Sequence, residues 1–202
     1  MIRNLAADVE AFTSNVFLVD GSDPTDKQGA EGRTVLVDPG NEFDVVSRVE
    51  KRVDGLDAVV LTHTHPDHVG NVEPVTDAFD VDAWGFDPEH ELVDHAIEDG
   101  ETVRLGAHDY RALHTPGHKD DHLCLLRTDG TVVFVGDLVF ANGGFGRTDL
   151  EEGDRRRLVE SIERLRDAAD GNLRALHAGH GPSVERNARD HIVLALRAAR
   201  TR

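Results

Sequence analysis

Short runs of β-branched and apolar residues alternate along this chain with segments in which apolar residues recur at helical spacing. The runs predict strands within 15–20, 33–40, 57–63, 80–86, 101–106 and 109–117, and another that ends near His180. A hairpin is predicted between 122–128 and 131–137, joined at Asp129-Gly130. The polar and glycine-containing segment from Gly21 to Gly32 predicts an exposed loop between the first two strands.

Three segments show the apolar spacing of helices. The first carries valines at 45, 46, 49 and 53, and the second, over 154–168, carries Leu158, Ile162 and Leu165 on one face with Asp154 as its N-cap. Ser183 is predicted to cap a last helix whose apolar residues are Ile192, Leu194, Leu196 and Ala199. Strands that alternate with helices, without repeats or Pro-rich linkers, predict an α/β fold and one domain over residues 1–202.

Composition narrows the class of protein. Hydrophobic residues make up 39% of the chain, enough for a core, and no run of about 18 apolar residues suggests a membrane span. The first twelve residues lack the apolar stretch of a secretory leader, and the single cysteine fits a reducing compartment, so we expect a cytoplasmic protein that is not bound to membranes. Cys124 lies in a strand segment and is expected to be a small buried apolar residue rather than a nucleophile.

Charge is the unusual feature of the composition. There are 39 acidic against 22 basic residues, a formal net charge of -17, and only three of the basic residues are lysines: Lys27, Lys51 and Lys119. Nucleic acid is not expected as a partner, because phosphate binding needs a basic surface. An acidic, lysine-poor surface repels itself in dilute buffer, which predicts a halophilic protein; an acidic protein from a GC-rich genome is the plainer interpretation.

Histidines and aspartates gather where apolar runs end. The stretch "VVLTHTHPDHVGN" contains His63, His65, Asp67 and His68 within six residues. Later runs end at His118 in "ALHTPGH", at Asp137 in "VVFVGD" and at His180 in "LRALHAGH". Imidazole and carboxylate groups presented at strand ends suit zinc, iron or manganese. Histidines that only cap and solvate a turn are the alternative interpretation.

The order and context of these seven residues, from about Asn15 to Pro182, resemble the metallo-β-lactamase-fold hydrolases. The resemblance implies an αββα sandwich: two mixed β-sheets with helices on the outer faces. It also implies two divalent metal ions, with zinc favoured and iron or manganese admissible. His63, His65 and His118 would hold one ion, Asp67, His68 and His180 the other, and Asp137 would bridge them.

The segment "GDLVFANGGFGRTDL", with "TPGH" and "GHGP", resembles the glyoxalase II-like thioesterases and their persulfide dioxygenase relatives. The resemblance implies a metal-dependent hydrolase in which metal-bound hydroxide attacks a small acyl-thiol thioester. Asp67 and Asp137 would act in catalysis by orienting the nucleophile. Arg147 could bind a substrate carboxylate or, equally, pair with a neighbouring acid of the chain.

Two other functions stay open. A mononuclear iron persulfide dioxygenase would use His63, His118 and Asp137 as a facial triad, with a small persulfide as its substrate. The third hypothesis is that the protein is a non-catalytic metal-binding domain. The thiol carrier of the substrate and the formation of homo-oligomers are left open. Three further histidines near the motifs could be hydrogen-bond partners of the metal ligands: His114, His122 and His177.

The acidic surface generates a prediction about salt. With a net charge of -17, the melting temperature should rise between dilute buffer and molar chloride, because molar salt screens repulsion beyond about 3 Å. Thermal unfolding followed by circular dichroism over a chloride series measures this directly. A melting temperature that stays flat or falls would contradict the halophilic interpretation.

Overall fold

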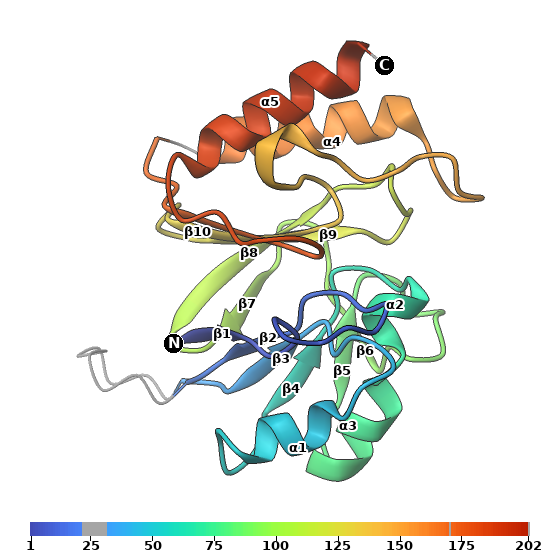
Figure 1. Cartoon of the computed structure of the whole chain (residues 1–202), viewed down its shortest axis with the longest axis vertical. Coiled ribbons are helices and arrows are strands. Elements are labelled where there is room, and N and C mark those ends of the chain that lie inside the picture. Colours follow the sequence, from blue (N-terminus) through green and yellow to red (C-terminus); the bar gives the residue numbers. More distant parts are fainter. Residues whose placement is uncertain (22–31, 170, 202) are drawn as a thin grey trace. The chain divides into compact units, whose positions relative to one another are not determined.

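The computed structural model describes residues 1–21, 32–169 and 171–201. The chain forms two compact units: Met1–Ile97 with Thr102–Tyr110, and Glu98–Glu101 with Arg111–Arg202. Figure 1 traces the elements of each unit along the chain. Nearly all of the loop predicted between Gly21 and Gly32 falls outside the described residues. The assignment of the whole chain to one domain stays a prediction.

The first unit is built on a six-stranded mixed sheet in which the strands lie in chain order. β2 runs antiparallel to both of its neighbours, β1 and β3, and β3, β4, β5 and β6 run parallel. Their bounds are Ile2–Asn4, Phe17–Val19, Val35–Val37, Ala58–Val60, Ala83–Gly85 and His95–Ala96. The middle strands are buried on both faces, which explains why their sequences are continuous apolar runs rather than alternating ones.

Helices α1 (Val45–Glu50), α2 (Pro66–Val69) and α3 (Val72–Phe79) accompany this sheet. Asp44 caps α1 by accepting a hydrogen bond from the Ser47 amide, and Val45 and Val49 are buried in the core of the unit. The predicted helix is therefore confirmed, but it ends at Glu50, so Val53 lies beyond it. Short parallel strands with buried helices leave the turns at the strand ends as the places for polar side chains.

A five-stranded mixed sheet has the order β11-β10-β9-β8-β7. β8 carries the chain from the first unit into the second. β9 and β10 form the predicted hairpin, whose turn uses Gly130 at φ +74°, and β11 pairs with β10 in parallel. The bounds are Thr102–Leu105, His108–His114, Leu123–Arg127, Val132–Gly136 and Ala175–Ala178, in chain order.

The helices of the second unit are α4 (Arg155–Ala168) and α5 (Ala188–Thr201), with the 3-10 turn η1 (Ala141–Gly143) before them. Asp154 caps α4 through the Arg157 amide, as predicted. The apolar face of α4 packs in one core cluster with Leu176 and Ala178 of β11 and with side chains of α5. Burying this face stabilises the unit by roughly 1.5–3 kcal/mol for each large aliphatic side chain.

The predicted start of the last helix was wrong. α5 begins at Ala188, and the Ser183 hydroxyl instead lies 2.9 Å from Nδ1 of His177. The reason is tertiary: Val184 pairs with Leu176 of β11, which holds the chain extended just where the cap was expected. Leu194, predicted on the apolar face, is 45% exposed, whereas the other three predicted positions are buried: Ile192, Leu196 and Ala199.

The predicted fold class and the interpretation of Cys124 as a buried residue are confirmed. Two mixed sheets with helices make an α/β protein. Cys124 is fully buried in β9, and burial raises the pKa of its thiol to about 12, which suits an inert apolar residue. Within the described residues, none of the helices combines the length and the apolar character that crossing a membrane requires.

Candidate metal centre

The first group of predicted ligands lies in the loop that follows β4 and in the short helix α2. His63 and His68 are buried, and His65 and Asp67 are half-buried. Nε2 of His63 lies 3.1 Å from Nδ1 of His65, close to the separation of about 3.3 Å expected for two nitrogens bound to one tetrahedral ion at 2.0–2.1 Å. Ligand atoms of His63 and His68, and of Asp67 and His68, lie within 4.8 Å of each other. The loop therefore gathers all four groups.

A buried aspartate that the sequence analysis missed orients two of these histidines. Asp38 follows β3, is 2% exposed and has a positive φ of 52°. Its Oδ1 accepts a hydrogen bond from the Thr62 amide at 2.7 Å. Its Oδ2 accepts from the Thr62 hydroxyl at 2.7 Å and lies 2.9 Å from Nδ1 of His68. One carboxylate thus joins the end of β3 to the ligand loop.

These contacts determine the tautomers. A carboxylate can only accept, so Nδ1 of His68 carries the proton and Nε2 carries the lone pair that a metal requires. The single hydroxyl hydrogen of Thr62 goes to Asp38, so the Thr62 oxygen must accept from Nδ1 of His63, 3.2 Å away. Nε2 of His63 then also carries the lone pair that a metal requires. The Asp38 carboxylate thus sets the tautomer of His68 directly and that of His63 through Thr62.

Backbone bonds hold the loop in place. The Gly40 amide donates to the carbonyl of His68 at 2.9 Å, and the Ser14 amide donates to the carbonyl of Asp67 at 2.9 Å. A Cβ at Gly70 would lie 2.1 Å from Oδ1 of Asn41, so a side chain there would require the Asn41 side chain to move. Hydrogen bonds from the β1–β2 connection and from the turn after β3 therefore fix the backbone of the ligand loop, from which the candidate ligand side chains extend.

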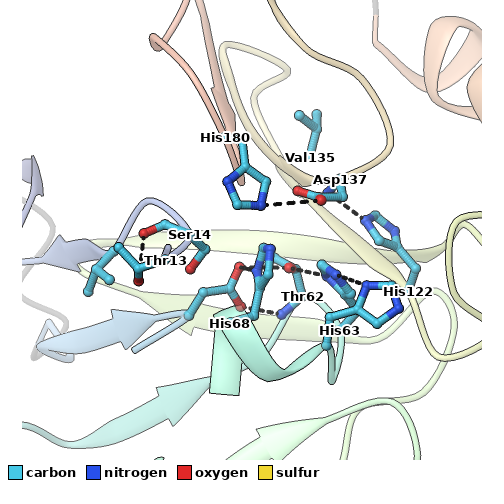
Figure 2. Close-up of polar contacts among 12 residues, drawn as sticks. Thr13, Ser14, Thr62, His63, His68, His122, Val135, Asp137 and His180 are labelled. Atoms are coloured by element: carbon cyan, nitrogen blue, oxygen red, sulfur yellow. Dashed lines mark hydrogen bonds and ion pairs between the residues drawn. The ribbon is translucent and has the colours of Figure 1, made fainter. Parts of the chain in front are cut away.

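The second group of predicted ligands comes from three strand ends of the second unit. Asp137 directly follows β10, His118 lies in the turn after β8, and His180 follows β11. Oδ2 of Asp137 lies 3.5 Å from Nε2 of His118 and also 3.5 Å from Nε2 of His180. The side chains of Asp137 and His118 are less than 10% exposed, and that of His180 is 33% exposed. Figure 2 shows Asp137 and His180 facing each other.

Residues of the motifs "TPGH" and "GRTDL" hold the His118 side chain in place. Nδ1 of His118 donates to the carbonyl of Arg147 at 2.8 Å, so Nε2 carries the lone pair on this histidine as well. Gly146 must be glycine, because a Cβ there would lie 2.1 Å from the Asp137 carbonyl oxygen. Gly117, at φ +130°, packs so closely on α4 that a Cβ would lie 2.2 Å from the Leu158 amide nitrogen.

The Arg147 side chain is engaged within the protein. Its Nε and Nη2 contact the two carboxylate oxygens of Asp149 at 2.8 and 2.9 Å. The guanidinium lowers the pKa of Asp149 to about 2, and the carboxylate in turn raises the pKa of Arg147. Both side chains are more than 60% exposed, so solvent screens this pair. The contact to substrate expected of Arg147 stays a prediction.

The three additional histidines differ in their surroundings. Nε2 of His122 accepts a hydrogen bond from the backbone amide of Asp137 at 3.0 Å, so His122 does contact a predicted ligand. Nε2 of His114 lies 2.6 Å from the carbonyl of Asp120. His177 contacts Ser183, and burial lowers the pKa of its imidazole to about 4. Of these three, His122 is the one with a direct hydrogen bond to a ligand residue in the described contacts.

The donor set fits a divalent metal. Five imidazoles and two carboxylates without a thiolate suit zinc or iron, and three of the imidazoles are fixed with Nε2 as the lone-pair atom. The structure brings four of the predicted ligands together in the first unit and three in the second. That the two groups join in one centre stays a prediction.

The comparisons with known proteins identify the family. Residues 9–186 match the model of the metallo-β-lactamase superfamily, and the chain belongs to that superfamily. The resemblance inferred from the sequence is confirmed, and so is the fold.

Among curated relatives, hydroxyacylglutathione hydrolase GloC of Haemophilus influenzae is 29% identical over 175 residues, covering 75% of this chain and 81% of the relative. A hydroxyacylglutathione hydrolase of Salmonella paratyphi A is 30% identical over 167 residues, covering 82% of this chain and 62% of the relative. This chain thus spans less than two thirds of the Salmonella protein.

Solved structures agree with this assignment. TTHA1623, solved in a di-iron-bound form, is 29% identical, has a TM-score of 0.71 and covers 98% of this chain and 96% of its own. ETHE1 from Myxococcus xanthus has a TM-score of 0.73 at 23% identity, covering 100% of this chain and 90% of its own, and therefore supports the fold alone.

The role of Asp38 yields a prediction. In Asp38→Asn, the amide oxygen can still serve the Thr62 amide, but the NH₂ group then faces His68 and favours the tautomer with the proton on Nε2. We expect zinc affinity, measured by competition with a chelator, to fall about 10–100-fold. Asp57→Asn is the matched control, since Asp57 also accepts from a backbone amide, that of Thr34 at 2.7 Å, on the exposed surface. Unchanged affinity in Asp38→Asn would contradict the tautomer argument.

Proposed function

We propose that this protein is a metal-dependent thioester hydrolase of the glyoxalase II-like type. In this proposal the two groups of ligands meet and hold two divalent ions, with zinc favoured. His63, His65 and His118 bind one ion, Asp67, His68 and His180 bind the other, and Asp137 bridges them. The substrate is a small acyl-thiol thioester. The single cysteine agrees with a reducing compartment such as the cytoplasm.

The position of Asp137 carries the proposal. One oxygen of its carboxylate lies at the same distance, 3.5 Å, from the Nε2 atoms of His118 and His180. In the proposed set these two histidines serve different ions. A carboxylate oxygen placed between ligands of two ions is suited to bridge them, and two-metal hydrolytic sites have ions about 3.5–4 Å apart. A single-ion site gives no comparable reason for His180 to face the same oxygen.

The protein's own groups would bind, orient and desolvate the reactants. Two divalent ions, when bound, provide a nucleophilic water at neutral pH and polarise the carbonyl of the substrate. With the ions bound, the carboxylates of Asp67 and Asp137 would orient the attacking water. The leaving thiolate is a weak base, so no general acid is required among the side chains. The hydrogen bonds to His63, His68 and His118 place the proton of each neutral ring on Nδ1 and direct the lone pair to Nε2, which limits the reorganisation needed on binding.

The relatives support the substrate class. Two curated relatives are named hydroxyacylglutathione hydrolases. We therefore propose a thioester whose acyl group is small, and we leave the thiol carrier open. If the carrier has a carboxylate, Arg147 could bind it by exchanging its exposed partner Asp149.

An iron enzyme is the second candidate. TTHA1623, 29% identical to this chain, was solved with two irons bound, which supports iron as a competitor of zinc. A mononuclear iron persulfide dioxygenase would need only His63, His118 and Asp137 as ligands and would leave three positions for water, oxygen and substrate. Asp67, His68 and His180 would then not be required for binding the metal.

The variant His180→Ala separates the two candidates. For a two-metal hydrolase we expect the metal content to fall from two to one per chain. Thioester kcat/KM should fall at least about 100-fold, the scale seen when one group that stabilises the transition state is removed. Metal analysis of native-purified protein and assays of thioester cleavage and oxygen uptake measure both outcomes.

The control is His108→Ala, which removes an exposed histidine of β8 and should leave both values unchanged. One iron per chain in the His180→Ala variant, with persulfide-dependent oxygen uptake retained, would overturn the hydrolase proposal in favour of the dioxygenase.

A further inference from the structure

His122 is a fully buried histidine that stands outside the proposed ligand set. It lies just before β9 and is 0% exposed. Nδ1 of its ring lies 2.8 Å from the hydroxyl oxygen of Thr115, and Nε2 lies 3.0 Å from the backbone nitrogen of Asp137. The ring therefore connects the beginning of the "TPGH" turn to the residue in the bridging position (Figure 2 shows the contact to Asp137).

The direction of these two hydrogen bonds is fixed by their chemistry. A backbone amide can only donate, so Nε2 of His122 is the acceptor and the proton lies on Nδ1. Nδ1 then donates to the Thr115 oxygen. The Thr115 hydroxyl hydrogen turns to Sγ of Cys124 or to the His122 carbonyl, each 3.4 Å away. The Thr115 amide also donates to the His122 carbonyl at 2.8 Å, so Thr115 and His122 form a closed pair.

The sheet explains why Asp137 needs this acceptor. β9 and β10 pair at Val133 with Leu126 and at Phe134 with Leu125. Beyond that the strand is irregular: the register with β11 shifts between Phe134 and Gly136, and Gly136 has a φ of +45°. The Asp137 amide thus lies past the paired part of β10, and the His122 ring takes the place of a strand partner. The hydrogen bond from the Asp137 amide to His122 fixes the backbone from which the Asp137 carboxylate extends.

The same ring also reaches the turn that carries His118. Thr115 is the first residue of that turn, and His118, three residues later, lies 3.5 Å from the Asp137 carboxylate. One end of the His122 ring therefore contacts the backbone of Asp137, and the other contacts the side chain of Thr115 at the start of the turn that carries His118. We propose that His122, through Thr115, is a positioning residue that sets the spacing between His118 and Asp137 for metal binding. This inference rests on the proposed metal-dependent function.

The test compares two substitutions of similar size. Leucine fills the buried space but accepts no hydrogen bond, whereas the glutamine amide can accept from Asp137 and donate to Thr115. We expect His122→Leu to lower Zn²⁺ affinity, measured by chelator competition, about 10–100-fold. We expect His122→Gln to restore the wild-type affinity. The visible absorption spectrum of Co²⁺-loaded protein should shift in the leucine variant and return in the glutamine variant.

His177→Leu is the matched control, because His177 is also a buried histidine of this unit, with Nδ1 bonded to Ser183. It should lower the melting temperature of the metal-free protein and leave Zn²⁺ affinity unchanged. Wild-type affinity in His122→Leu, an equal loss in His122→Gln, or an equal loss in His177→Leu would each overturn the positioning role.

If His122→Leu does not fold, Thr115→Val decides instead: lower Zn²⁺ affinity supports the role, and unchanged affinity overturns it. Thioester turnover by the wild type is measured separately. A wild type that binds two zinc ions and cleaves no thioester would contradict the proposed function while leaving the role of His122 intact.

Discussion

A histidine binds a metal only through a nitrogen that carries no proton, and the turns of this protein are arranged around that requirement. Three different groups fix the proton on Nδ1: a carboxylate for His68, a hydroxyl for His63 and a backbone carbonyl for His118. Each leaves Nε2 as the nitrogen with the lone pair that a metal requires. Because these partners are parts of the fold rather than of solvent, the ligand geometry is inherited from the packing of strands and turns.

The packing explains why glycines and short strands surround the ligands. The strands end abruptly at buried positions, so the next residue already belongs to a turn. Gly117 and Gly146 let α4 and the Asp137 backbone approach the His118 turn more closely than any side chain would allow. Asp38 and Asp137 play matched structural parts, each directly after a strand of its own sheet. Asp38 orients His63 and His68, and the Asp137 carboxylate lies between His118 and His180.

The sequence predicted the elements that depend on local pattern. Apolar runs located the main strands, valine spacing located α1, and Asp154 located the start of α4. The elements β1, β6 and α2, which have at most four residues each, were not predicted from the sequence, and neither was α3, although Val72, Val75 and Phe79 recur there at helical spacing. The cap at Ser183 was misplaced because the extended pairing of Val184 with Leu176 is a tertiary contact that local propensity does not report.

The candidate ligands could be recognised in the sequence because their motif is compact. The residues that hydrogen-bond to them could not be recognised in this way. Asp38 lies 24 and 30 residues from the partners that it orients, and His122 lies 15 residues from Asp137. No periodicity connects such positions. The sequence does contain a signal for Asp38. It is an aspartate at the end of a buried apolar run, immediately before Pro39 and Gly40, and a carboxylate in such a position requires hydrogen-bond donors nearby.

The proposed function requires a two-ion centre bridged by Asp137, which X-ray absorption at the zinc edge of the metal-loaded wild-type protein can detect. We expect two zinc ions per chain, nitrogen and oxygen ligands at about 2.0–2.2 Å without sulfur, and a metal–metal distance of about 3.5–4 Å. A single ion per chain at metal saturation, with no metal–metal scattering, would contradict it.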